Sequence, residues 1–85
     1  MLLRYTPAAR KDLAGLPAKV AAAIMGKLDA IAADPFAPHA SATKLVGTVA
    51  GYRVRHGDWR AKYHVDGAAG LVVVERVQHR SDVYR

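Results

Sequence analysis

The fold is decided by residues 51–65, which read GYRVRHGDWRAKYHV. Polar and apolar residues alternate on both sides of His56-Gly57-Asp58, a pattern typical of two half-buried strands joined by a short turn. The pattern predicts strands over Val49–His56 and Trp59–Val65. Because successive side chains of a strand point to opposite faces, the cations fall on one face and the aromatic and aliphatic residues on the other.

The residues before this hairpin favour one short strand and two helices. Alternation over Leu2–Thr6 predicts the strand, and Thr6-Pro7 is typical of a helix start, so a short helix is expected over Pro7–Gly15. A second helix runs from Pro17 to Asp34, where Asp34-Pro35 ends it. Its apolar stripe has spacings of four, four and three residues and consists of Val20, Ile24, Leu28 and Ile31.

The residues after the second helix predict a loop and then β structure to the end. Two prolines and several small residues predict a surface loop over Pro35–Thr43, and a third strand is expected over Leu71–Val77. The resulting order is β-α-α-β-β-β. It predicts a two-layer α+β domain spanning residues 1–85, with a helical hairpin packed on a small, mainly antiparallel sheet.

Composition narrows the class of protein. The chain has 85 residues and no cysteine, which excludes disulfide staples, cysteine-ligated zinc and a thiol nucleophile. Thirteen Lys and Arg against seven Asp and Glu give a net charge of +6, so we expect a polyanion or an acidic protein as partner. The sequence lacks a signal-peptide pattern and any apolar run of membrane-spanning length, so the expected location is the cytoplasm, without membrane contact.

The cations of the hairpin form the first candidate site. Strand alternation places Arg53 and Arg55 on one face of the first strand, and Arg60, Lys62 and His64 on one face of the second. Arginine suits phosphate because its guanidinium donates two parallel hydrogen bonds and stays charged. Such residues are also common on any exposed sheet face. The opposite face, with Trp59 and Tyr63, is expected to pack on the helices.

Four segments in order resemble a known family. They are Ala8–Pro17, Lys44-Leu45-Val46-Gly47, Gly51–Arg60 and Val77-Gln78-His79-Arg80-Ser81-Asp82-Val83-Tyr84. Together they resemble the RelE/ParE superfamily of bacterial toxins across nearly the whole chain. The RelE branch consists of ribosome-dependent endoribonucleases that cut mRNA in the ribosomal A site, whereas the ParE branch poisons DNA gyrase. The His79-Arg80 pair and the terminal Val83-Tyr84 are more similar to the RelE branch.

The resemblance implies roles for individual residues. Arg60 matches a charge-stabilising arginine, Arg80 a basic catalytic residue, and Tyr84 the tyrosine that RelE toxins use at the cleavage site. The predicted phosphate-binding residues are Arg53, Arg55, Lys62 and Lys44. At the positions of Arg53 and Arg55 RelE toxins often carry lysine, and Gln78 stands where they can carry another arginine.

The general base has to be another residue, because arginine is a poor proton acceptor at neutral pH. His79 is the first candidate, since an unperturbed imidazole titrates near pH 6.5. His56 is the second, although strand alternation places it away from the arginines. The spacing of the four histidines indicates no metal site, and no cofactor is expected.

Three functions therefore remain open at this point: an mRNA endoribonuclease, a ParE-like gyrase poison, and a catalytically weak toxin fold that acts mainly by binding its antitoxin. The resemblance implies an acidic, RelB-like antitoxin as partner of the chain in a hetero-oligomer. Operator DNA would then be bound through the antitoxin. The ribosome and mRNA are expected partners only for the first function.

Overall fold

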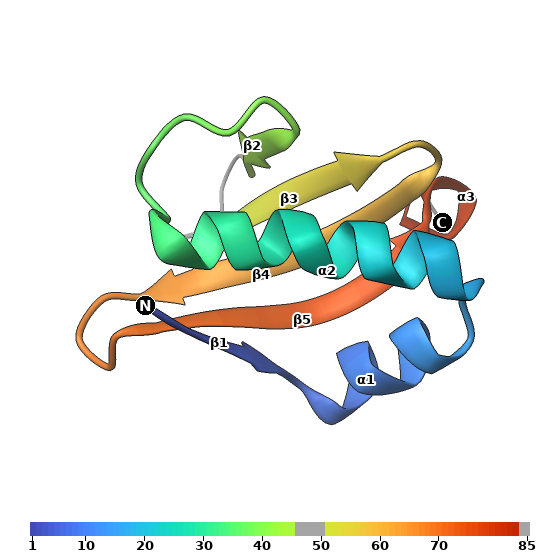
Figure 1. Ribbon diagram of the computed structural model, residues 1–85, viewed down its shortest axis with the longest axis horizontal. Coiled ribbons are helices and arrows are strands. Elements are labelled where there is room, and N and C mark those ends of the chain that lie inside the picture. The colour runs from blue at the N-terminus through green and yellow to red at the C-terminus, as the bar shows by residue number, and fades with distance from the viewer. Residues whose placement is uncertain (46–50, 84–85) are drawn as a thin grey trace.

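Five strands of the computed structural model, which describes residues 1–45 and 51–83, form one sheet in the order β1-β5-β4-β3-β2 (Figure 1). Strand β1 is parallel to β5, and the other neighbours are antiparallel. The elements in chain order are β1 (Leu2–Tyr5), α1 (Pro7–Ala14), α2 (Ala18–Ala33), β2 (Ala42–Lys44), β3 (Gly51–His56), β4 (Trp59–Asp66), β5 (Leu71–His79) and α3 (Arg80–Val83).

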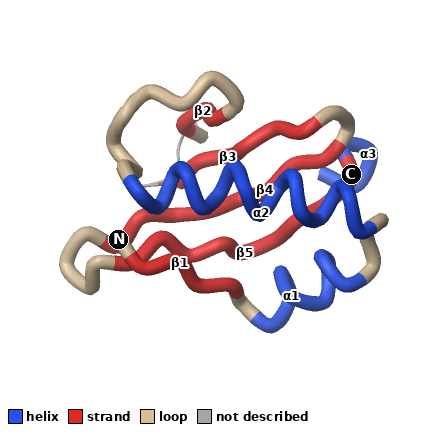
Figure 2. Tube along the Cα trace, in the orientation of Figure 1, coloured by secondary structure: helices blue, strands red, loops and turns tan. Residues whose placement is uncertain are grey.

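The helical hairpin lies on the sheet as the sequence predicts. Helix α2 crosses one face of the strands, and α1 continues the path of β1 alongside β5 (Figures 1 and 2). The α+β class, the two-layer arrangement and the mainly antiparallel sheet are thereby confirmed. The face of the sheet away from α2 is called the outer face below.

Two elements were missed by the sequence prediction. Ala42–Lys44 forms β2 and pairs with β3, so the expected loop over Pro35–Thr43 is wrong at its end. The four residues after β5 form α3. Segments of three and four residues are too short to show a strand or helix period, which is why neither was predicted. Part of the predicted strand Val49–His56 lies outside the described residues, and β3 is described from Gly51.

The core forms where the apolar stripe of α2 meets the inner face of the sheet. Ile24, Leu28 and Ile31 are buried, in agreement with the predicted stripe, while Val20 is half-buried at its edge. The sheet contributes Val54, Ala61, Tyr63, Val65, Val72, Val74 and Val77. Tyr63 stacks on Tyr52 of β3 with ring centroids 5.2 Å apart, which ties the two central strands together beneath the helix.

A β-bulge divides β5 into two halves of opposite phase. Tyr63 of β4 pairs with Val74, but Lys62, the residue before Tyr63, pairs with Arg76. Glu75 is therefore the extra residue in β5. As a result Val74 and Val77, three positions apart, are both buried. Unbroken alternation would have turned Val77 outward, so the bulge decides which side chains at the end of β5 reach the outer face.

Side chains close the edge of β5 beyond the end of β1. The Thr6 hydroxyl donates to the Glu75 carbonyl at 2.7 Å and accepts from the Ala9 amide, so it also caps α1. Asp12 of α1 accepts from the Val77 amide at 2.9 Å and from Arg76 Nε at 2.8 Å. The backbone groups that β1 does not reach thus find side-chain partners.

In the part of the chain that the structure describes, helices fall short of the length and apolar character needed to cross a membrane.

Replacing Asp12 by alanine should lower the free energy of unfolding by about 2 kcal/mol at pH 7, because the Val77 amide loses its acceptor and Arg76 its ion partner. Burial opposes the ionisation of Asp12, but hydrogen bonds from Arg76 and Val77 outweigh it, so the pKa of this carboxyl is lowered from 3.8. The stabilisation is therefore complete above that value and lost as the pH falls through the folded-state pKa.

Urea unfolding of the wild type and of Asp12→Ala at pH 7 and at acidic pH measures the difference in free energy of unfolding, with the exposed Asp29→Ala as control. The two curves should approach each other at low pH. A difference that is the same at every pH would contradict the ionic role of Asp12.

Candidate functional site: an arginine face and an adjoining groove

Strands β3 and β4 bring four cations together on the outer face. Arg53 lies directly opposite Lys62, and Arg55 directly opposite Arg60. We call these four residues the arginine face. Directly opposed residues of antiparallel strands have Cβ atoms about 4.5–5.5 Å apart, so each pair joins two like charges at close range. The shared face that alternation predicts for these residues is confirmed by the register of the hairpin.

A hollow of about 360 Å³ opens over this face, lined by Ala40, Ser41, Thr43, Arg53, Arg55 and Arg60. Arg60 is held at its rim, because its Nη1 donates to the carbonyls of Gly57 and Trp59 at 2.7 and 2.9 Å. Gly57 has a φ of +58°, a conformation that suits glycine in this turn. The turn therefore fixes one guanidinium while the hollow leaves room for an anion beside three of them.

A smaller hollow of about 80 Å³ extends the site toward β5. It is lined by Leu45, Arg53, Arg60, Lys62, Arg76 and Gln78. Arg76 and Gln78 reach the outer face because the bulge shifts the phase of β5, and they pair with Lys62 and Arg60. Sequence reasoning did not place Arg76 here, since nothing in the residue pattern of β5 signals a bulge.

One carboxylate also enters the outer face at the bulge. Glu75 Oε2 lies 3.8 Å from Lys62 Nζ, and Glu75 Oε1 lies 3.8 Å from His64 Nδ1. The three side chains are between about one third and one half exposed, so the ion pairs contribute little stability. His64 lies on the same face as the arginines, and its acidic neighbour in the site is Glu75.

The structure does not bring His79 to the arginine face. His79 pairs with Trp59, whereas Arg60 pairs with Gln78, so His79 and Arg60 lie on opposite faces of the sheet. The His79 ring meets the Trp59 indole edge-on, with centroids 5.2 Å apart at 89°, and its Nδ1 lies 2.9 Å from Ser81 Oγ. The family motif predicted that His79 acts together with Arg60. The bulge in β5 instead places the two side chains on opposite faces of the sheet.

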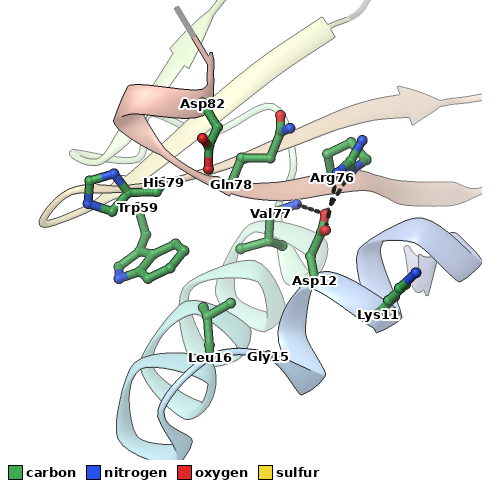
Figure 3. A pocket seen from close by; sticks show the side chains of 10 residues that line it. All are labelled: Lys11, Asp12, Gly15, Leu16, Trp59, Arg76, Val77, Gln78, His79 and Asp82. Carbon is green, nitrogen blue, oxygen red and sulfur yellow. Dashed lines mark hydrogen bonds and ion pairs between the residues drawn. The ribbon is translucent and has the colours of Figure 1, made fainter. Parts of the chain in front are cut away.

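His79 instead lines a groove of about 550 Å³ at the free edge of β5, between α1 and α3 (Figure 3). Leu16, Trp59 and Val77 give it an apolar side, and Gln78, Asp82 and Lys11 bring polar groups to it. Trp59 was expected to pack in the core. It does so only in part, since it is half-buried and also forms a wall of this groove.

The remaining predicted site residues lie in different places. Arg80 begins α3 beside the β3–β4 turn, where its amide donates to the Asp58 carbonyl at 2.6 Å and its Nη1 lies 3.9 Å from Asp58 Oδ1. Lys44 pairs with Tyr52, so Thr43 and not Lys44 shares the face of Arg53. Tyr84 lies outside the described residues. His56 pairs with Trp59, away from the arginines, as alternation predicts.

Two further groups bear on the chemistry. Burial, with a smaller effect of Tyr52, raises the pKa of Tyr63 to about 12, so its hydroxyl is a poor acid or base near neutral pH. Within residues 1–45 and 51–83, histidine and acidic side chains do not gather in a group of three that could hold a metal ion. The chemistry considered below uses arginine, lysine and imidazole.

Comparison with known proteins identifies the family. A family model described as ParE toxin of type II toxin-antitoxin system, parDE, matches residues 3–84. The chain belongs to the RelE/ParE superfamily of type II toxins. The toxin is 33% identical to Toxin RelG of Mycobacterium tuberculosis over 85 residues, which cover 98% of this chain and 94% of the relative.

Solved structures of RelE toxins share the fold. The isolated RelE toxin of E. coli superposes with a TM-score of 0.81 at 26% identity, covering 98% of this toxin and 89% of that chain. A chain of the toxin-antitoxin complex RelBE2 from Mycobacterium tuberculosis superposes with a TM-score of 0.76 at 28% identity, covering 93% and 96%. These similarities support the family resemblance found in the sequence motifs.

Neutralising Arg55 should stabilise the toxin, because Arg55 faces Arg60 directly across the strands. We expect Arg55→Gln to raise the free energy of unfolding by about 0.5 kcal/mol at low salt, and the gain to shrink as salt screens the repulsion. Chemical denaturation at two ionic strengths measures it. The matched control is Arg10→Gln on the exposed side of α1, and a destabilised Arg55→Gln would show that the pair is not repulsive.

Proposed function

We propose that the toxin is a ribosome-dependent endoribonuclease that cleaves mRNA and thereby inhibits translation. The observation that supports this most is the arginine face, where two like-charged pairs stand across one hairpin and a hollow opens between three guanidinium groups. The Arg55–Arg60 pair lowers stability through like-charge repulsion, and a phosphodiester is an anion that arginine pairs with bidentately. A site that is costly for folding is typical of a functional surface.

The proposed reaction requires no metal. The ribose 2′-oxygen attacks the adjacent phosphorus, the P–O5′ bond breaks, and the products carry a 2′,3′-cyclic phosphate and a 5′-hydroxyl. A base accepts the 2′-hydroxyl proton, an acid supplies a proton to the leaving 5′-oxygen, and cations stabilise the extra negative charge at phosphorus. Arg60 is the cation that stabilises this negative charge, because its guanidinium is already fixed by two backbone carbonyls.

The other members of the arginine face bind the phosphates. Arg53 and Arg55 lie in the same hollow as Arg60, and Lys62 stands opposite Arg53. Arg80 lies at the turn that also holds Arg60, and we assign it to the same substrate strand. The role proposed for Tyr84, which is to orient the 2′-hydroxyl, rests on the family motif.

Two imidazoles are candidates for the proton transfers. His79 remains the first proposal, although it approaches a substrate only around the free edge of β5. His64 lies on the arginine face itself, with the Glu75 carboxylate 3.8 Å away. A carboxylate beside an imidazole can orient the ring for proton transfer.

Cleavage of an mRNA on translating ribosomes tests the proposal, with primer extension to map the ends. The wild-type toxin should cut in the A site only when ribosomes are present. Arg60→Ala should reduce the rate about 100-fold or more, because a positioned charge stabiliser is lost. The control Arg10→Ala removes an exposed cation from α1 and should cleave normally.

Other outcomes would favour other functions or other residues. Because the matching family model is described as ParE toxin, a parallel assay of DNA gyrase is informative. Gyrase-dependent DNA breaks with intact mRNA would replace the endoribonuclease proposal by that of a gyrase poison. If His64→Ala or His79→Ala loses one limb of the pH–rate profile, the replaced imidazole is the one that transfers the proton. The variant Tyr84→Phe tests whether the tyrosine hydroxyl is needed for cleavage.

We further propose that the toxin forms a hetero-oligomer with an acidic, RelB-like antitoxin in the cytoplasm. The similar chain from Mycobacterium tuberculosis was solved in a toxin-antitoxin complex. A net charge of +6 and an exposed arginine face are complementary to an acidic chain. The antitoxin would cover the arginine face and would carry any contact with operator DNA.

Replacing Arg53, Arg55 and Arg60 together by glutamine should weaken antitoxin binding at least about tenfold and reduce its salt dependence. Calorimetric titration of the toxin with the proposed RelB-like antitoxin measures both quantities. The matched control replaces Arg4, Arg10 and Lys19, three exposed cations elsewhere, and loses the same charge. Equal affinity of the two triple variants would show that the antitoxin does not cover the arginine face.

A further inference from the structure

Three hollows of the surface are neighbours, since each shares lining residues with the next. The hollow over the arginine face shares Arg53 and Arg60 with the small hollow beside it. That small hollow in turn shares Arg76 and Gln78 with the groove at the free edge of β5. An extended chain on the arginine face can therefore reach this groove around β5, since Arg60 and Gln78 are direct cross-strand neighbours and Gln78 lines the groove.

The chemistry of the groove differs from that of the arginine face. Arg76 is paired with Asp12 at 2.8 Å, so the charges of these two residues offset each other. Asp82 is exposed at the rim, and Lys11 is the other charged residue that lines the groove. A groove of mixed charge that contains a carboxylate is a poor site for a second phosphate. It suits an uncharged group that carries hydrogen-bond donors.

Two rings make the groove suitable for a planar group. The Trp59 indole and the His79 imidazole stand at 89° to each other, and Leu16 and Val77 complete the apolar side (Figure 3). His79 Nδ1 is hydrogen-bonded to Ser81, while Nε2 has no hydrogen-bond partner within residues 1–45 and 51–83. Gln78 adds an amide that both donates and accepts. Rings with adjoining polar groups are the means by which proteins hold unstacked nucleobases.

We propose that this groove binds a nucleobase of the RNA strand whose phosphate lies on the arginine face, and that it selects bases with an exocyclic amino group. The proposal rests on the proposed function, because it takes RNA as the ligand. Asp82 only accepts hydrogen bonds, so adenine, cytosine and guanine can donate an amino hydrogen to it. Uracil has no amino group, and its ring N3–H lies between two carbonyl oxygens that a carboxylate repels, so uracil is disfavoured.

An acidic antitoxin segment is the other occupant to consider. The exposed carboxylate of Asp82 lines the groove and would repel such a segment, whereas the charge of Asp12 is offset by Arg76. The arginine face has the better charge complementarity for it. The groove is therefore assigned to RNA, and binding of an acidic peptide becomes one outcome of the test.

The single tryptophan of the chain is Trp59, so its fluorescence reports on this groove alone. The wild-type toxin is titrated with fully 2′-O-methylated tetranucleotides of A, C or U, which lack the attacking hydroxyl. An abasic tetranucleotide with the same phosphates is the matched ligand. Anisotropy of a labelled strand measures binding, and Trp59 emission measures entry of a base into the groove.

The A and C strands should quench Trp59 and bind about fivefold or more tightly than the U strand, the effect of one net hydrogen bond. The abasic strand should bind without quenching. Asp82→Asn should remove the preference over U, because an amide can also donate to uracil. Asp29→Asn, an equivalent change on the exposed side of α2, should retain it.

Three results would overturn the inference: anisotropy that rises while Trp59 emission stays constant, equal quenching by the abasic strand, or quenching by a poly-glutamate peptide and not by RNA. The proposed function fails separately, since these titrations use no ribosome and no cleavage. Base-dependent quenching by a toxin that leaves mRNA intact would overturn only the endoribonuclease proposal.

Discussion

The two-residue turn at Gly57-Asp58 fixes the register of β3 against β4, and the arginine face depends on that register. It sets Arg53 against Lys62 and Arg55 against Arg60, while Tyr52 and Tyr63 stack on the other side. A slip of one residue would turn every cation toward α2 and expose the tyrosines to water. Burial of the tyrosines thus holds the repelling cations together, so the core supplies the stability that the arginine face lowers.

The sequence predicted the arginine face and the core because both follow from a period of two or of 3.6 residues. Alternation over residues 51–65 separated arginines from aromatic residues correctly, and the stripe of Ile24, Leu28 and Ile31 is buried. Alternation failed at Glu75. Continued unbroken from Val72 and Val74, it would have placed His79 on the arginine face, but the extra residue reverses the phase. A bulge is chosen by packing across strands, which a single segment does not reveal.

The same bulge gives the end of β5 two different surfaces. Toward β4, Arg76 and Gln78 extend the arginine face, where charge dominates and a phosphate is the suitable ligand. Around the edge, Trp59 and His79 form a groove in which rings and a carboxylate favour an uncharged group. A nucleotide has both parts. In the proposed function, one surface binds the RNA backbone and the other distinguishes the bases.

The side-chain closure of β5 by Thr6 and Asp12 bears on the behaviour of the toxin in solution. Strand β1 offers four residues of free edge and β2 offers three, and the stretch of β5 between β1 and α3 is covered by α1. Long uncovered edges are the templates on which sheets of separate molecules join. With short edges in the described part of the sheet, and with a strong net positive charge, the toxin should stay dispersed at concentrations where an open sheet of this size would assemble into fibres.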